Sequence, residues 1–186
     1  SNTSPLQLST HSIRWKYATP YRLFNSLNVV AGYHHLKDHR KESPYVNPAS
    51  SQPTIMVTDY DKSTSNMYLM SFDLTSIPSP STIVRFGGDL SVDYVTGSRY
   101  RSLGTGISLP LLPRYPDGSR YIQSGLFSHI TYNLSSRIWI EGGLRYSFIH
   151  ADLNLEGVES ERGFNAYDTQ FKFTTGSLGL SWSPTP

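Results

Sequence analysis

The chain of 186 residues has no cysteine and few charged residues. Without cysteine there is neither a disulfide scaffold nor a thiolate for a metal site or a nucleophile. Charged residues make up 16%, against about 25% in an ordinary soluble domain, and the net charge of +2 gives no electrostatic basis for nucleic-acid binding. No run approaches the ~20 apolar residues of a membrane helix. Any membrane contact would therefore have to be made by strands.

Aromatic residues are frequent at 13%, which excludes a disordered chain. Apolar and polar residues alternate with period two, as they do in strands that have one apolar face. The clearest case is residues 137–149. One face carries Ile138, Ile140, Gly142, Leu144, Tyr146 and Phe148, and the other carries Trp139, Glu141, Gly143, Arg145 and Ser147.

The same alternation predicts further strands, and most of them exceed the ~5–6 residues of a typical globular strand. They reach the ~9–11 residues that a tilted membrane-spanning strand needs. The total is about seven, and an eighth strand is left open in residues 51–60, around Pro53 to Val57. Besides residues 137–149, the predicted strands are 11–18, 22–34, 66–75, 82–95, 120–134 and 169–183.

Short and long connections alternate along the chain. Residues 18–20, 76–81 and 135–136 are short links, whereas 35–65, 97–119 and 154–168 are long, and 35–65 is also polar. One long link contains Pro116-Asp117-Gly118, a strong turn signal. This alternation is typical of an outer-membrane barrel with short periplasmic turns and long extracellular loops.

Two other architectures compete with this interpretation. A soluble β-sandwich also has strands with one polar face, but it gives no reason for every long loop to lie at one end. A complete small barrel needs an even number of strands, with eight the usual minimum. The odd count and the final prolines, which cannot donate ladder hydrogen bonds, count against a complete barrel.

Four segments resemble strands of the TonB-dependent outer-membrane receptors, and they follow one another along the chain in the order that this family has. Residues 138–146 (Ile-Trp-Ile-Glu-Gly-Gly-Leu-Arg-Tyr) are similar to a characteristic strand of that family. So are residues 125–132 before it, Phe86-Gly87-Gly88-Asp89-Leu90-Ser91 upstream, and residues 175–182 downstream. The resemblance implies an all-β, antiparallel transmembrane barrel of about 22 strands, filled by an N-terminal plug. The 186 residues include no plug and no TonB box, so we expect residues 1–186 to be one middle segment of the barrel.

The resemblance also implies partners and a location. We expect the bacterial outer membrane and its lipid, a plug domain of the same receptor, and the TonB complex that energises transport. On the polar faces of the predicted strands stand Asp89 and Glu141, with Arg85 and Arg145. We expect these four residues to line the lumen, where family acids of this kind contact plug arginines.

Two groups of residues near strand ends are candidates for ligand binding. His34, His35 and His39 form a histidine cluster beside Lys37, Arg40 and Lys41, which could attract an anionic siderophore or a lipopolysaccharide phosphate. A solvated loop is the simpler interpretation, and no metal site is predicted because the ligand spacing is unfamiliar. The second group suits an anionic aromatic ligand, or packs around the 116–118 turn. It comprises Arg114, Tyr115, Arg120 and Tyr121.

The sequence therefore favours a transport receptor for a scarce nutrient such as an iron–siderophore or a similar metal chelate. The alternative is a small, structural or adhesive outer-membrane barrel that binds a host or partner surface. No nucleophile stands with an identifiable base, so an enzyme is not expected, and neither is a cofactor.

Overall fold

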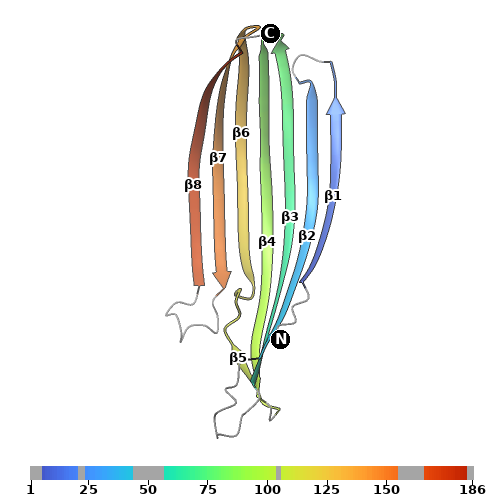
Figure 1. The fold of residues 1–186 in the computed structure, drawn as a ribbon, viewed down its shortest axis with the longest axis vertical. Coiled ribbons are helices and arrows are strands. Elements are labelled where there is room, and N and C mark those ends of the chain that lie inside the picture. The colour runs from blue at the N-terminus through green and yellow to red at the C-terminus, as the bar shows by residue number, and fades with distance from the viewer. Residues whose placement is uncertain (1–5, 21–23, 44–56, 104–105, 155–165, 184–186) are drawn as a thin grey trace.

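The computed structural model describes residues 6–20, 24–43, 57–103, 106–154 and 166–183. Their secondary structure consists of strands and turns (Figure 1). Within them there is no helix of the length and apolarity that crossing a membrane requires, a finding that does not bear on strands. The strands are β1 Leu6–Ala18, β2 Ser26–Glu42, β3 Val57–Ser79, β4 Thr82–Leu103, β5 Ser108–Leu111, β6 Ser119–Ser135, β7 Ile138–Asn154 and β8 Ala166–Trp182.

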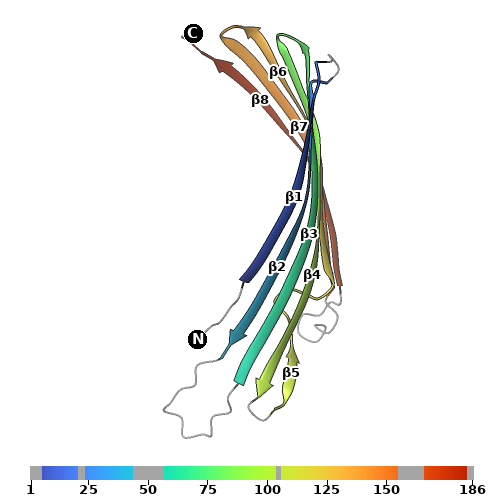
Figure 2. The ribbon, with the colours of Figure 1, turned by 90° about the vertical axis from the view of Figure 1, so that its right-hand side faces the viewer.

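All strands belong to one antiparallel sheet in the order β1-β2-β3-β4-β6-β7-β8, and the short β5 pairs with the far end of β4. Each long strand thus lies beside its neighbour in the sequence. The sheet is curved and twisted (Figure 2), and it is open, with β1 and β8 at its edges. The predicted all-β antiparallel class is confirmed. The count of about seven matches the long strands and does not include β5, whose four residues contain Pro110 and are too short to predict a strand.

The short turns lie together at one end of the sheet, at the top of Figure 1. They join β1 to β2, β3 to β4 and β6 to β7. The first is closed by a hydrogen bond from the Thr19 amide to the Asn25 carbonyl, at 2.9 Å. The strand ends that the long connections join lie at the opposite end, which is termed the outer end here because long loops of such barrels are extracellular. Residues 44–56, 104–105 and 155–165 of these connections are outside the described residues.

Two of the predicted long loops are wrong in extent. The strand β2 extends to Glu42 instead of ending at residue 34, β3 begins at Val57, and β4 continues to Leu103. Strand pairing continues through these predicted loop segments because their side chains pair across the ladder. The open question of a strand around Pro53 falls outside the described residues, apart from Val57.

The register gives every strand an outward and an inner face. The outward face is apolar over the central part of the sheet, and Leu126 and Leu144 are 52% and 62% exposed. Exposure of large apolar side chains is the expected property of a lipid-facing surface. None of the described large side chains is fully buried, since a single sheet has no second layer to cover it. The residues that define the outward face on β3 and β4 are Tyr68, Met70, Phe72, Leu74, Val84, Phe86, Leu90 and Val92.

Candidate functional site

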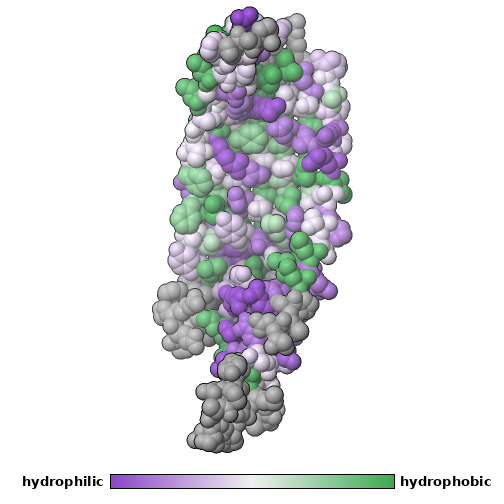
Figure 3. All heavy atoms as spheres, in the orientation of Figure 1, coloured by the Kyte–Doolittle hydropathy of each residue, from purple (hydrophilic) through white to green (hydrophobic). Residues whose placement is uncertain are grey.

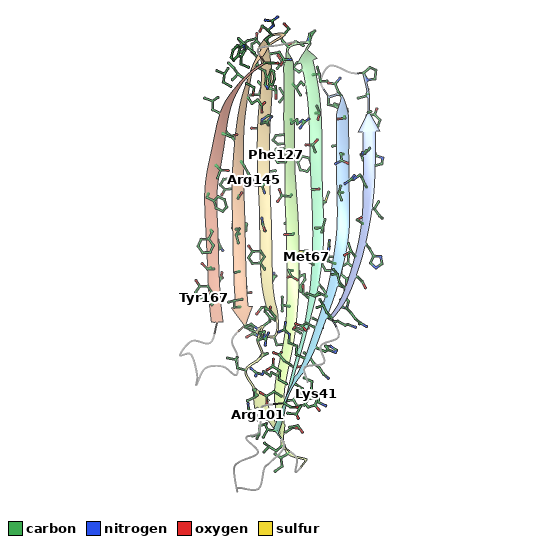
Figure 4. The ribbon with its side chains drawn as sticks, in the orientation of Figure 1. Lys41, Met67, Arg101, Phe127, Arg145 and Tyr167 are labelled. Atoms are coloured by element: carbon green, nitrogen blue, oxygen red, sulfur yellow. The ribbon has the colours of Figure 1, made fainter. Side chains whose placement is uncertain are left out.

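The centre of the inner face holds an ion pair between Asp89 of β4 and Arg145 of β7. The Nη2 atom of Arg145 donates to both carboxylate oxygens, at 2.8 and 3.0 Å, and Nε donates to the Ser147 hydroxyl at 3.1 Å. Between them on β6 stands Gly125, over which the guanidinium lies; a Cβ on this glycine would overlap it. Both side chains are about one-third exposed, so they line the lumen without being sealed off from it. Figure 4 labels Arg145 beside Phe127, its register partner.

The other two predicted lumen residues also lie on the inner face. Glu141 accepts a hydrogen bond from the indole N–H of Trp139 at 3.0 Å, and His129 approaches it at 3.7 Å. Arg85 is exposed and stands opposite His129 in the register of β4 and β6. The structure thus places all four predicted lumen residues on the inner face. Their contact with a plug stays a prediction.

At the outer end, two matching tripeptides pair across β3 and β4. Asp59-Tyr60-Asp61 runs antiparallel to Arg99-Tyr100-Arg101, so that each aspartate stands opposite an arginine. Arg101 donates to both oxygens of Asp59, at 2.7 and 2.9 Å, and Arg99 adds a third bond at 3.2 Å. On the opposite face, Tyr60 and Tyr100 stack with centroids 5.0 Å apart. In Figure 3, hydrophilic residues gather on the lower part of the molecule, towards the outer end of the strands.

This cluster lies beyond the apolar part of the strands. Its contacts shift the pKa values of Asp59 and Arg101. The hydrogen bonds from Arg101 lower the pKa of the Asp59 carboxyl, and they do so against the opposing effect of burial. The same hydrogen bonds raise the pKa of Arg101. The carboxylate of Asp59 is nearly buried, with 9% of its side chain exposed, and is therefore held in its charged form. The predictions from the sequence do not include this cluster, although the complementary Asp-Tyr-Asp and Arg-Tyr-Arg patterns are a usable signal for it.

Residues 112–118, which follow β5, fold back against the inner face of the outer end. Arg114 reaches Asp61 at 3.6 Å and Glu42 at 3.5 Å. The Asp117 carboxylate accepts a hydrogen bond from the Gly97 amide at 3.1 Å. A Cβ at Gly97 would overlap the backbone of Tyr115, so only glycine allows this close approach. The predicted turn is present, and Gly118 closes it with a φ of 73°. This stretch of chain is termed the inner segment.

The inner segment covers a cleft of about 230 Å³ at the mouth of the lumen. Its polar groups come from three strands. The Asp93 carboxylate accepts a hydrogen bond from Ser65 at 2.6 Å, and Asp38 pairs with Arg40 at 2.8 Å. The cleft offers carboxylates, hydroxyls and one phenol to a small polar ligand. Its lining residues are Leu36, Asp38, Ser63, Thr64, Ser65, Asp93, Val95 and Tyr115.

The histidine cluster is divided by the alternation of β2. His34 is on the inner face, where its Nδ1 lies 3.3 Å from the Thr10 hydroxyl. His35 points outward, with its Nδ1 2.7 Å from the Asn66 side-chain oxygen, and His39 is exposed on the same outward face. The expected solvated loop is therefore wrong, because all three residues belong to a strand. Among the described residues, no three His, Asp or Glu side chains group closely enough to hold a metal ion.

The second candidate group is also divided. Arg114 and Tyr115 belong to the inner segment, and Tyr121 of β6 is on the inner face. Arg120 instead faces outward and lies 3.9 Å from Asp152 of β7. Ligand binding by all seven candidate residues stays a prediction, but the seven do not share one surface.

The comparison with known families covers nearly the whole chain. The model of the TonB-dependent receptor-like β-barrel matches residues 2–186. The chain belongs to this family. The protein is accordingly one of the bacterial outer membrane, as the resemblance of its strands implied. None of the curated proteins matches the chain.

The chain is similar in fold to solved structures of other proteins. One is described as the copper transporter OprC, with a TM-score of 0.76 over 97% of this chain and 11% sequence identity. The identity is too low to carry more than the fold. The chain spans 28% of the length of that structure.

Proposed function

We propose that this barrel wall belongs to a receptor that imports a scarce nutrient across the outer membrane with energy supplied through TonB. In this proposal residues 1–186 form one segment of a larger barrel, and a plug domain of the same receptor fills the lumen. The 28% share of the copper transporter that the chain covers supports the segment proposal. An iron–siderophore or a similar metal chelate is the proposed substrate.

The observation that carries the proposal is the inner segment seated on the lumen wall. A purely structural or adhesive barrel would direct its loop outward to its partner. Here Arg114, Tyr115 and Asp117 turn inward, and Tyr115 lines a cleft on the path to the lumen. This arrangement favours a ligand that is captured inside the mouth of the barrel.

Arg114, next to Tyr115 in the inner segment, suits an anionic chelate. The ion pairs of Arg114 with Asp61 and Glu42 are long, at 3.6 and 3.5 Å, and the guanidinium is 41% exposed. A carboxylate or catecholate of the ligand would compete for this guanidinium, since an arginine forms paired hydrogen bonds with planar anions. Tyr115 and Tyr121 would add aromatic contacts, and His34 would add a ring nitrogen on the same face.

The inner-face pairs at mid-lumen would meet the plug. Asp89 and Arg145 already neutralise each other in the wall, so a plug arginine would share Asp89 instead of taking an unpaired acid. Glu141 and Arg85 offer the further charges for this contact.

The test is uptake by cells that express the full receptor. We expect labelled ferric hydroxamate or catecholate chelates to enter cells with TonB and not cells without it. Uptake of free Cu²⁺ is measured in parallel, because the structurally similar protein is described as a copper transporter. Replacing Tyr115 by Ala should reduce uptake, whereas Tyr167→Ala, on β8, serves as the control. Uptake that does not depend on TonB would overturn the proposal. The adhesive barrel would be favoured if the receptor imports none of these compounds and its removal makes the cells adhere less.

A further inference from the structure

The outer part of β2 separates its charges onto two surfaces. In the stretch 37–42, the side chains of Asp38, Arg40 and Glu42 point inward, where Asp38 and Arg40 pair at 2.8 Å. Lys37 and Lys41 point outward. Along the sequence the stretch contains charges of both signs, but the acidic and basic side chains of this stretch that face away from the lumen are lysines.

A third lysine joins this outward surface from the neighbouring strand. Lys62 of β3 stands directly opposite His39, and the register places Lys37 and Lys41 diagonally on either side of it. Diagonal neighbours of an antiparallel pair are about 7–8 Å apart. Lys41 also lies over the ring of Tyr60, with its Nζ 5.6 Å from the centroid. Among the described residues of β1 to β4, no carboxylate lies on the outward face. The three lysines are termed the lysine patch.

Next to the lysine patch lies a row of tyrosines that marks the edge of the apolar surface. Tyr33, Tyr68 and Tyr94 follow one another across β2, β3 and β4, with centroids 5.1 and 6.4 Å apart. Beyond this row towards the short turns, the outward side chains are apolar. Tyrosine is enriched where the hydrocarbon of a membrane meets its head groups. The lysine patch therefore stands at the level of the head groups, on the extracellular side.

We propose that the lysine patch binds the phosphate groups of an outer-leaflet glycolipid, the lipopolysaccharide of the outer membrane. A basic residue at a membrane surface attracts anionic head groups, and the long lysine stems can lie along the wall while the ammonium groups reach the phosphates. Cations that stand opposite or diagonal to one another on a sheet repel. A phosphate between them removes that repulsion. The receptor's substrate is not the occupant, because the lysines point away from the lumen.

The test measures lipid on the full receptor purified from outer membranes. We expect wild-type receptor to bind lipid A that carries two phosphates. In a rebinding assay, loss of one lysine should weaken binding about fivefold, and K37Q/K41Q/K62Q on the order of a hundredfold. Lys16→Gln, on the inner face, and Lys172→Gln, outward on β8, are controls that should leave binding unchanged. The triple exchange of the same lysines for Arg should keep the binding.

Three results would overturn the proposal. The first is that the triple Gln variant binds lipid A as tightly as the wild-type receptor does. The second is that the wild-type receptor binds dephosphorylated lipid A as tightly as lipid A with two phosphates. The third is that it binds inorganic phosphate alone equally tightly. If the triple Gln variant fails to assemble, Lys62→Gln alone decides: a fivefold loss supports the lysine patch, and an unchanged affinity rejects it. Uptake of substrate is not needed for this readout, so the outcome is independent of the proposed function.

Discussion

Arg101 binds both carboxylate oxygens of Asp59 across the β3–β4 ladder, at 2.7 and 2.9 Å. This pair lies outside the apolar part of the sheet and joins two strands that project into water. It explains why the ladder continues where a loop was expected.

Replacing Asp59 by Asn should loosen the outer end of the sheet. The exchange leaves Arg99 and Arg101 without their anion, and the two guanidinium groups are 30% and 41% exposed. We expect a loss of about 1–3 kcal/mol in the free energy of unfolding, between the values for exposed and buried pairs. Urea titration of the receptor in lipid vesicles measures it. Asp152→Asn, whose pair with Arg120 is long at 3.9 Å, should change the value by less than about 0.5 kcal/mol; equal losses in both variants would contradict the special role of Asp59.

The outer end should also loosen in acid. The pKa of the Asp59 carboxyl is lowered in the folded protein, chiefly by its hydrogen bonds from Arg101. A lowered pKa stabilises the fold fully above the ordinary value for Asp, about 3.9. This contribution is lost as the pH falls through the lowered value. Hydrogen exchange of the amides of residues 57–63 in β3 and 97–103 in β4 should therefore be constant from pH 7 to 5, after correction for intrinsic rates, and rise below about pH 4. Asp59→Asn should abolish this acid step, and an unaltered step would assign it to another group.

Gly97→Ala should displace the inner segment without unfolding the sheet. The new Cβ would overlap the backbone around Tyr115, which has no flexible end to move aside. We expect faster proteolysis within residues 112–118 and retention of heat-modifiable assembly. Gly142→Ala is the matched control, since its nearest neighbour would be Cγ2 of Ile130 at an ordinary 3.8 Å. An inner segment that stays protected in the Gly97 variant would show that the contact is not a tight one.

Leu144→Arg should destabilise the barrel in the membrane. Leu144 is 62% exposed on the outward face, opposite Ser128 and Gly176. An arginine near the bilayer midplane costs about 2–4 kcal/mol. The free energy of folding into vesicles is the measurement, and Thr169→Arg, on the inner face of β8, should cost far less. A neutral result at Leu144 would reverse the assignment of the two faces.

The membrane-spanning part of the fold could be predicted from the sequence because alternation there reflects burial in lipid on one side. Residues such as Leu144 and Tyr146 repeat with a period of two, and the register confirms their faces. Beyond the membrane this cause disappears. Both faces of the outer strands are wet, so Asp59 and Arg101 show no alternation of hydropathy, and only their complementary charges reveal the pairing.

The candidate site was less accessible to prediction. Arg114 and Tyr115 were singled out, but nothing in the local pattern says that the stretch folds inward onto Gly97, a contact across the chain. The histidines were grouped by their proximity in the sequence. Strand geometry then separates His34 from His35 and His39, because neighbours in a strand point to opposite faces.

The division of β2 into two surfaces has a consequence for how this receptor tolerates change. A substitution at Lys37 or Lys41 alters only what the wall presents to lipid, and one at Asp38 or Arg40 alters only the lumen. Loss of a single residue earlier in β2 would slip the register and exchange both surfaces at once. The two surfaces can therefore diverge independently by substitution, whereas the length of the strand is fixed by both together.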